Sequence, residues 1–315
     1  MIYFTQMEVC FMAHDEVIKE VDKRESLRVV TKNEFITAPE LATLTLKARK
    51  LLYLAVAQCK VSDKEFYEYR VPVPEFAEMM GIDSSNVYRT ADKLTDELMK
   101  SFIRVQKANK HFAKYSLFSK CEYEEDGELY FKLNKDMTDL LLSVNGNFSK
   151  PLLSDFMKMK SPYSMAIWHL FQREMKSKLP WVGNPIYFEL SLEELRTVTG
   201  TADKKTYDIL NNFKIKVLDK AIREIKDNQL ADISYTNKKK GRTVVGFVFK
   251  CSDWLMGDRQ PTERTLKKMR KIELWKISKQ RPLTKAEDDE YQELILELDQ
   301  MTLADYENGV YLQNN

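Results

Sequence analysis

Apolar residues recur at helical spacing in two long segments of the chain, residues 44–59 and residues 161–177. A spacing of three and four residues gathers such side chains on one face, so each segment is predicted to form an amphipathic helix. Alternating or continuous apolar runs follow at 69–73 and at 186–190, which is typical of short strands. The hydrophobic pattern thus predicts the same pair of elements, a helix and then a strand, twice along the chain.

The segments that follow also repeat, because a shift of 119 positions lays Gly81 over Gly200. Each glycine ends a short predicted helix, where the left-handed C-cap conformation favours that residue type. A tyrosine lies seven positions beyond each glycine, at Tyr88 and Tyr207. A second helix is predicted after each turn, with N-cap oxygens at 83–85 and 201–203. The same shift of 119 positions matches three further pairs of apolar residues: Leu94 and Phe213, Leu98 and Val217, and Ile103 and Ile222.

Each copy ends in two strand-like runs, at 112–123 and 128–134 in the first and at 231–237 and 243–250 in the second. Helix, strand, helix, turn, helix and hairpin is the order of a winged helix. We therefore predict a mostly helical α+β protein with two tandem winged-helix domains related by pseudo-symmetry and a helical C-terminal extension. The predicted boundaries are an N-terminal segment 1–27, a first domain 28–145, a second domain 146–252 and the extension 253–315.

Composition narrows the function classes without choosing one. The chain has 315 residues, 50 Lys and Arg against 48 Asp and Glu, and a net charge of +2, so any attraction for a polyanion must come from local charge. The four cysteines form no CxxC pair, and no apolar run is long enough to span a bilayer, which favours a reduced, cytoplasmic protein that does not enter the membrane. The three histidines are far apart in sequence and are expected to be surface or core residues.

Motifs for enzymatic chemistry are absent from the sequence. There is no GxGxxG or GxSxG, and residues 200–206 lack the second glycine of a phosphate-binding loop. A His-apolar-His metal motif near a tyrosine, as in a rolling-circle nuclease, does not occur. These absences disfavour a rolling-circle nuclease and ATP binding, and the residues give no reason to expect a cofactor or a metal.

The predicted second helix of the second unit has the two faces of a DNA-recognition helix. Its core stripe is Tyr207, Leu210, Phe213, Val217, Ala221 and Ile225. The residues expected to face outward are Lys204, Lys205, Asp208, Asn211, Asn212 and Lys216. Amides pair with adenine edges and lysines meet guanine or phosphate, so this face could read a major groove. A merely solvated helix surface is the alternative interpretation.

The predicted wing of the second unit is basic. Lys238, Lys239, Lys240 and Arg242 lie between its two strand-like runs, where they could contact the phosphate backbone. Between positions 203 and 242 there are eleven Lys and Arg against six Asp and Glu, a local charge of +5. The alternative is that these cations only protect the edge of a sheet from pairing.

The first unit has a weaker version of the same surface. Its second helix is expected to expose Ser84, Ser85, Asn86, Arg89 and Lys93, but its predicted hairpin tip at 124–127 is acidic and would repel phosphate. Either another loop, such as 106–110, approaches DNA, or this unit has a second role. We expect it to combine partial DNA contact with self-association.

The runs at 211–225 and 231–249 resemble the second half of the initiator Rep proteins of theta-replicating, iteron-type plasmids. The stretch 191–200 with Tyr207, and the early segment 33–56, fit the same family. The resemblance covers residues 28–250. The acidic first wing and the long C-terminal extension are departures from it or variable parts of it.

The resemblance implies two winged-helix domains and an initiator that performs no covalent chemistry. Such proteins bind directly repeated origin sequences in double-stranded DNA, help to open adjacent A/T-rich DNA and recruit host replication proteins such as a replicative helicase. Their dimers often bind an inverted repeat and repress their own gene. Carried over by position, Ser85, Asn86, Arg89 and Lys93 in the first unit and Lys204, Lys205, Asp208, Asn211, Asn212 and Lys216 in the second would contact bases, while Lys238, Lys239, Lys240 and Arg242 would hold phosphate.

Two other functions remain open from the residues. A transcriptional regulator could use the same two modules, and origin unwinding on a supercoiled plasmid would separate it from an initiator. An assembly protein whose winged helices bind other proteins would show no salt-dependent binding to duplex DNA, whereas about six phosphate contacts should cost about a thousandfold in affinity between 50 and 200 mM salt.

Overall fold

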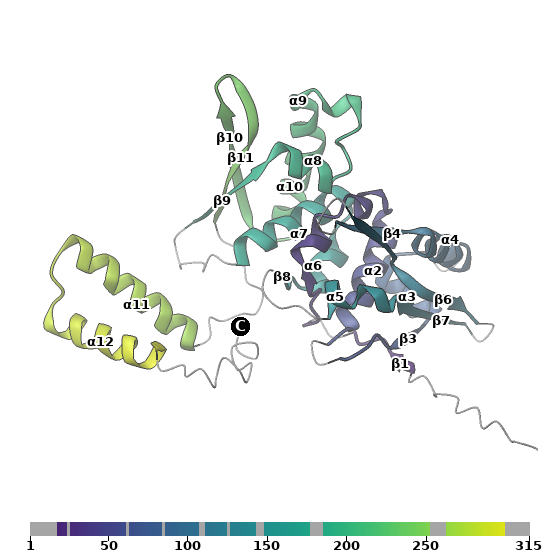
Figure 1. Ribbon diagram of the computed structural model, residues 1–315, viewed down its shortest axis with the longest axis horizontal. Helices are drawn as coiled ribbons and strands as arrows, with labels where there is room; N and C mark the ends of the chain where they lie inside the picture. The colour runs from purple at the N-terminus through teal and green to yellow at the C-terminus, as the bar shows by residue number, and fades with distance from the viewer. Residues whose placement is uncertain are drawn as a thin grey trace, which may run out of the picture. The chain divides into compact units, whose positions relative to one another are not determined.

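The structure is a computed structural model. It describes residues 18–23, 26–60, 63–83, 86–106, 111–124, 127–142, 148–176, 185–252 and 263–299. Two compact units are present: the first comprises both predicted winged helices, and the second contains the C-terminal helices. Figure 1 shows the order of the elements along the chain.

The first winged helix is built on α2 (Leu46–Gln58), which is buried along almost its whole length. The Thr45 hydroxyl caps this helix by accepting from the Ala48 amide at 3.3 Å. The other elements are β3 (Glu68–Pro72), α3 (Val73–Met80), α4 (Val87–Lys100), β6 (Phe118–Tyr123) and β7 (Glu128–Leu133). With β1 (Ile18–Glu20) the strands form one sheet in the order β1-β3-β7-β6, in which β6 and β7 are the wing.

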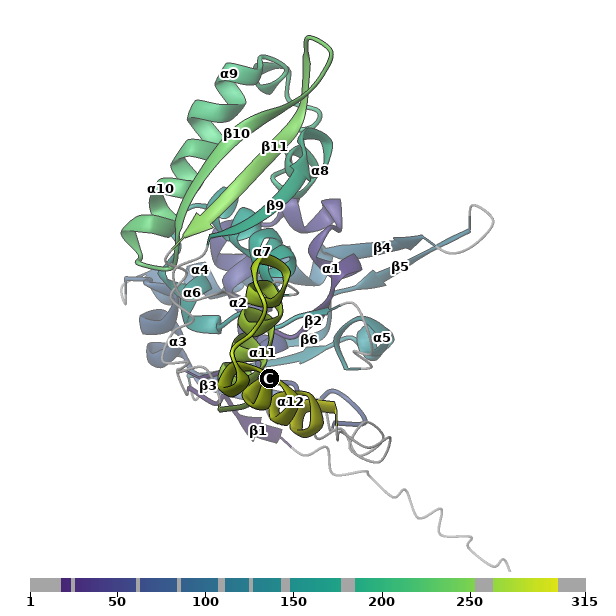
Figure 2. The same cartoon turned by 90° about the vertical axis from the view of Figure 1, so that its left-hand side faces the viewer.

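The prediction of a single strand over 112–123 is wrong, because the chain leaves one sheet and enters another at Leu117. The strands β4 (Phe102–Gln106) and β5 (Phe112–Ser116) pair as a separate hairpin before β6 begins. Leu117 is buried at the junction, its amide donates to the Ser101 carbonyl at 3.1 Å and its carbonyl accepts from Asn134. Figure 2 shows the β4–β5 hairpin extending away from the body of the unit.

The second winged helix repeats the plan with α7 (Pro162–Lys176), β9 (Ile186–Ser191) and α8 (Leu192–Val198). The recognition helix follows as three continuous pieces: α9 (Leu210–Phe213), a π-helical segment η5 (Lys214–Leu218) and α10 (Asp219–Asp227). The wing is the long hairpin of β10 (Asp232–Lys240) and β11 (Thr243–Ser252), and the sheet order is β10-β11-β9. The predicted fold class is confirmed in both units.

The predicted core stripe of this helix is confirmed at Phe213, Val217, Ala221 and Ile225, all of which are fully buried. These residues are spaced by four, so an unbroken α-helix would rotate the stripe by about a third of a turn over its length. The wider π-helical turn at 214–218 absorbs this rotation and keeps the four side chains facing the core. The spacing of the stripe therefore explains the irregular helix.

The glycine C-caps are also confirmed, with φ of 61° at Gly81 and 62° at Gly200. Their surroundings differ. A side chain at Gly81 would meet open space, whereas a Cβ at Gly200 would lie 2.9 Å from the Cβ of Ala42 in η1 (Pro39–Thr43). Gly200 is therefore also a point of close approach between α8 and the first winged helix.

A buried polar network joins the parts of this unit around His169 of α7. Its Nδ1 lies 2.8 Å from the Tyr53 hydroxyl of α2, and its Nε2 lies 3.0 Å from Ser149 Oγ of β8 (Phe148–Ser149) and 3.4 Å from Thr31 Oγ1 of β2 (Thr31–Lys32). Burial, followed by the charges of Arg49 and Arg173, lowers the pKa of His169 to about 3. His169 is thus a hydrogen-bonded core residue, as expected, and it is neutral at physiological pH.

Short elements connect these parts: α1 (Asn33–Ile36), η3 (Lys135–Met137), α5 (Thr138–Leu141) and α6 (Leu153–Lys158). In the C-terminal compact unit, α11 (Glu263–Gln280) pairs with α12 (Lys285–Asp299). The contact includes a bidentate ion pair of Arg270 with Glu290, with both distances 2.8 Å. The predicted C-terminal helices are confirmed. Among the described helices, none combines the length and apolar character needed to cross a membrane.

Candidate nucleic-acid interface

The exposed side of the second recognition helix begins at Asn211 and continues through Lys216. The stripe of Phe213 and Val217 faces the opposite way into the core. The structure thus separates a buried apolar side from a polar, partly basic outer side, which is the arrangement that a major-groove helix needs.

The prediction that Lys204, Lys205 and Asp208 lie on this helix is wrong. The segment forms a turn and a short 3₁₀-helix, η4 (Lys205–Tyr207), and the α-helix starts only at Leu210 with no side-chain cap. All three side chains are exposed on the loop that leads into the helix. Tyr207 and Leu210, predicted as core, are half-buried, since Tyr207 lies in the 3₁₀-helix and Leu210 is the first residue of the α-helix.

Arg196 of α8 holds the entrance loop in place. Its guanidinium donates to the backbone carbonyls of Tyr207 at 2.6 Å and Asp208 at 3.3 Å, and it lies 5.9 Å from the ring centroid of Phe213. One arginine therefore connects the first helix of the helix-turn-helix, the loop and the core of the recognition helix. Sequence reasoning missed Arg196 because its carbonyl acceptors are set by the loop conformation and not by residue type.

The two adjacent asparagines differ in what they can contact. Asn212 is half-buried, and its side-chain amide donates to the Thr206 carbonyl at 3.0 Å. Asn211 is exposed. Because a bidentate contact with adenine uses both the donor and the acceptor of the amide, Asn211 is the better placed of the two for base reading.

Two apolar side chains stand out on the same surface: Ile209 is 61% exposed and Ile215 is 53% exposed. The cost of leaving them in water would be offset by contact with an apolar group of a partner, and in the major groove the thymine methyl is such a group. Sequence analysis missed both residues. The signal for Ile215 was its position outside the four-residue stripe.

The wing places its cations along and beyond the end of a two-stranded ribbon. Lys238, Lys239 and Lys240 belong to β10 itself, so the predicted tip shrinks to a two-residue turn of Gly241 and Arg242. Gly241 has φ of 62°, as the first central residue of such a tight hairpin turn requires. All four cations are exposed, and Figure 2 shows the β10–β11 ribbon rising beside α9 and α10.

Lys238 differs from the other wing cations because it forms an ion pair with Glu189 of β9. Gly246 lies directly opposite Lys238 in the ladder, between β10 and β9. Glu189 lies opposite Val248, two positions further along the ladder, so the ion pair runs diagonally across β11. Lys239, Lys240 and Arg242 are the cations closer to the turn.

The first unit presents a smaller polar face. Asn86, Arg89 and Lys93 are exposed around the start of α4, and the Arg89 guanidinium donates to Asn86 Oδ1 at 2.9 Å. Ser84 and Ser85 lie outside the described residues, as do 107–110 of the loop considered as a second DNA contact. The wing carries exposed Glu122 and Glu124.

Two parts of the chain match the profiles of known protein domains. Residues 28–172 match the profile described as initiator replication protein, WH1, and residues 191–251 match initiator Rep protein, WH2. The chain belongs to the initiator replication protein family. As a member it is a DNA-binding initiator of plasmid replication and not an enzyme, as predicted.

The fold of this initiator is similar to that of a protein solved with DNA. The Pi initiator protein in complex with iteron DNA aligns with a TM-score of 0.60 and 23% identity, over 73% of this chain and 98% of that one. Domains 2 and 3 of RctB align with a TM-score of 0.32 and 10% identity, over 70% of this chain and 82% of that one. The two winged helices of this initiator thus correspond to the fold of the Pi protein.

The described residues of this initiator group no three His, Cys, Asp or Glu side chains in a way that could hold a metal ion. Cys59, Cys121 and Cys251 are not in disulfides, and burial raises the pKa of Cys121 to about 12. Around the second recognition helix and its wing, the exposed groups are amides, cations and isolated apolar side chains.

Proposed function

We propose that this initiator binds directly repeated sequences of duplex DNA at its plasmid origin and reads them chiefly with the second winged helix. The observation that carries the proposal is the exposed group of Asn211, Ile215 and Lys216 beside the wing cations Lys239, Lys240 and Arg242. Amide and apolar groups suit base edges, and cations suit phosphates. The likeness to a protein whose structure contains iteron DNA supports the same mode.

In this proposal the entrance loop supplies further contacts. Lys204 and Lys205 are exposed where the chain enters the helix, and Asp208 follows them. The lysines contact phosphate next to the bases read by Asn211, and Asp208 accepts from a cytosine amino group. Asn212 contributes indirectly, because its hydrogen bond to Thr206 fixes the loop. In the first unit Asn86, Arg89 and Lys93, with Ser85 beside them in sequence, contact the adjoining groove.

We further propose that bound copies open adjacent DNA and recruit a host replicative helicase, and that self-association through the first winged helix yields dimers that repress the gene. The acidic side of the first wing supports a protein contact there, because Glu122 and Glu124 would repel the DNA backbone. This division gives DNA reading to the second unit and protein contacts to the first.

Footprinting on the DNA that flanks this gene tests the proposal. We expect evenly spaced protected repeats, about two helical turns apart, as for modules lying along one face of the duplex. Asn211→Ala should cost about 1 to 3 kcal/mol on the preferred site and nothing on random duplex. Asn228→Ala, at the far end of the helix, is the control. Equal losses on random duplex would contradict base reading by Asn211, and absence of repeated protection would contradict the proposed target.

A further inference from the structure

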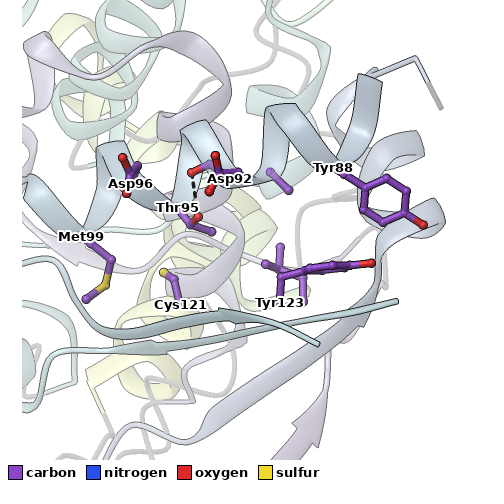
Figure 3. A pocket seen from close by; sticks show the side chains of 9 residues that line it. Tyr88, Asp92, Thr95, Asp96, Met99, Cys121 and Tyr123 are labelled. Carbon is purple, nitrogen blue, oxygen red and sulfur yellow. Dashed lines mark hydrogen bonds between the residues drawn. The ribbon is translucent and has the colours of Figure 1, made fainter. Parts of the chain in front are cut away.

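The first winged helix contains an open groove between its recognition helix and its wing. The groove has a volume of about 300 Å³. One wall is α4, which contributes Tyr88, Asp92 and Met99, and the other is β6, which contributes Cys121 and Tyr123 (Figure 3). A volume of this size admits one or two side chains of a partner rather than a folded surface.

Large apolar groups of the groove are exposed to solvent. Tyr88 is 56% exposed, Tyr123 is 45% exposed and Met99 is 41% exposed. The two tyrosine rings pack edge to face with centroids 5.3 Å apart, so the two walls meet there in one apolar surface. Aromatic and methionine side chains are enriched where proteins contact one another.

The corresponding groove of the second winged helix is closed. There Tyr235 of the wing donates to Asp219 at 2.6 Å, and the Lys214 ammonium lies 5.3 Å from its ring centroid. Leu218, which the 119-residue shift matches to Met99, is fully buried. In the second winged helix Tyr235 and Leu218 thus fill the groove, whereas the first winged helix leaves it open.

The rim of the open groove is acidic. Asp92, Asp96, Glu122 and Glu124 are all exposed along α4 and β6. Asp96 is paired with Lys100 at 2.6 Å and Glu122 with Lys120 at 2.7 Å, whereas Asp92 forms no ion pair within the described part of the chain. A rim of this sign repels nucleic acid and attracts a basic protein segment that carries an apolar anchor.

A segment with that chemistry lies on the same chain, in the β4–β5 hairpin. Its described residues, 102–106 and 111–116, contain Arg104 and Lys114 and no Asp or Glu. Phe102 is 37% exposed and Phe112 is 50% exposed, and each ring is covered by a cation: Arg104 lies 4.0 Å from the Phe112 centroid and Lys114 lies 4.6 Å from the Phe102 centroid.

The hairpin also carries an unfavourable feature that a partner would relieve. Arg104 and Lys114 are directly opposite each other in the antiparallel ladder, and like charges in that position destabilise a hairpin. An acidic partner removes this repulsion. Phosphate would do so too, but a phosphate contact would leave Phe102 and Phe112 in water, whereas the tyrosine wall of the groove would cover them.

We propose that the β4–β5 hairpin of one copy docks into the groove of the next copy when both are bound to adjacent direct repeats. This inference rests on the proposed binding to direct repeats. Copies on such repeats all point the same way along the DNA, so neighbours meet through two different surfaces and not through one self-complementary patch. A protruding basic hairpin and an acidic groove are two such surfaces.

The contact is compatible with DNA reading by the same helix. On α4 the groove residues and the residues Asn86, Arg89 and Lys93 are separated by roughly a quarter of a turn, at 3.6 residues per turn. The contact is also small, and small interfaces are weak on their own. It therefore acts when DNA holds two copies close together and raises their effective concentration.

The test compares full-length protein on one repeat and on two adjacent repeats, with affinities measured by fluorescence anisotropy. We expect the second copy to bind about tenfold more tightly than the first, within the usual range of coupling between sites. Asp92→Lys with Asp96→Lys, and separately Arg104→Glu with Lys114→Glu, should each abolish this cooperativity and leave binding to a single repeat unchanged. All four substitutions together restore the attraction with its sign reversed, so cooperativity should return.

Two further variants keep the test decisive. Tyr123→Ala removes part of the apolar surface of the groove without altering charge and should lower cooperativity. Glu65→Lys with Asp139→Lys changes the net charge as much as Asp92→Lys with Asp96→Lys does, but at exposed sites outside the groove, and should leave cooperativity unchanged. The proposal is overturned if the variant that combines all four charge reversals does not recover cooperativity. It is equally overturned if the groove substitutions lower cooperativity and the hairpin substitutions do not, which would indicate a different occupant of the groove. It is also overturned if the hairpin variants weaken single-repeat binding, which would make the hairpin a DNA contact. If the wild-type protein did not bind a single repeat at all, that result would instead contradict the proposed function.

Discussion

The wing of the second unit carries Lys239, Lys240 and Arg242 around its turn, whereas the wing of the first unit carries Glu122 and Glu124. The scaffolds beneath them are alike, with a glycine-capped helix, a recognition helix and a hairpin in the same order. The difference therefore lies in the surface charge and in the filling of one groove. The two copies of the fold thus keep similar cores while the charges on their wings have opposite signs.

The comparison extends to the recognition helices. In the second unit the helix is interrupted by a π-helical segment and its entrance loop is held by Arg196. In the first unit α4 is a regular helix of 14 residues. The second winged helix thus has a recognition helix whose entrance is held by side-chain contacts, and the first has a regular helix with acidic residues on its groove side.

The largest effect is expected from removing the second wing's cations. Lys239→Ala, Lys240→Ala and Arg242→Ala together should lower affinity for every duplex by about a hundredfold and reduce the slope of log affinity against log salt by about three, since each phosphate contact contributes about 0.9. Salt titrations of duplex binding measure both quantities. The control is Lys60→Ala, Lys64→Ala and Lys135→Ala, which removes equal charge from exposed sites of the first unit. An unchanged slope in the wing variant would remove the wing from the DNA interface.

The next effect separates the two matched glycines. Gly81→Ala adds only the cost of a left-handed residue, about 1 to 2 kcal/mol. Gly200→Ala adds to that a clash with Ala42, because its Cβ would lie 2.9 Å from the Ala42 Cβ and 3.2 Å from the Ala42 oxygen. Unfolding in urea should show Gly200→Ala to be less stable than Gly81→Ala by about 1 to 3 kcal/mol, the usual cost of overpacking. Equal losses of stability in the two variants would mean that the two winged helices are not tightly packed at Gly200.

A smaller effect is expected from the residue that positions the entrance loop. Arg196→Gln removes the donors to the Tyr207 and Asp208 carbonyls and should lower affinity for the preferred site by about tenfold, or about 1.4 kcal/mol. Because Arg196 does not itself reach phosphate in this arrangement, the salt slope should stay that of the wild type. A slope reduced by about one unit would instead identify Arg196 as a direct phosphate contact. Arg196→Lys, which keeps one donor group, should recover part of the affinity.

The contact between the two winged helices at His169 predicts a pH effect. In the folded protein His169 has a pKa of about 3, far below its usual value of 6.5. As pH falls below about 6.5 the unfolded chain takes up a proton that the folded chain does not, so stability decreases. Asp155 acts in the opposite sense, since burial raises its pKa to about 6 and the folded chain gains its proton first.

The two groups can be separated by substitution. In Asp155→Asn protein, the free energy of unfolding should fall by about 1 kcal/mol per pH unit between about pH 6 and pH 4.5, up to the limit for one proton. Adding His169→Gln should remove most of that slope. A slope that persists in the double variant would assign the acid sensitivity to other groups and would leave the junction without a titrating residue.

The sequence predicted the parts of this molecule that depend on periodicity. The repeat, the glycine caps and the stripe from Phe213 to Ile225 follow from spacing alone, and all are present. It failed at the start of the recognition helix, since the entry at Leu210 depends on backbone contacts with Arg196. It also missed the β4–β5 hairpin, because the break at Leu117 comes from tertiary packing inside a continuous strand-like pattern.

The candidate site shows the same division. Exposure of Asn211, Lys216 and the wing cations could be predicted from amphipathic pattern and turn position. The engagement of Asn212 with Thr206 and of Lys238 with Glu189 could not, because each joins residues whose proximity is created by the fold. Charge patterns therefore identify a surface, and contacts decide which of its members are available.

The smallest effect tests that last distinction within the second wing. Since Lys238 is paired with Glu189, Lys238→Ala should weaken duplex binding less than Lys240→Ala does, by about threefold. Glu189→Gln releases Lys238 and should raise affinity by about twofold, with a slightly steeper salt slope. Duplex binding at two salt concentrations resolves differences of this size. Equal losses for Lys238→Ala and Lys240→Ala, with no gain from Glu189→Gln, would show that Lys238 leaves its ion pair when DNA binds, so that the whole strand end and not only the turn forms the phosphate contact.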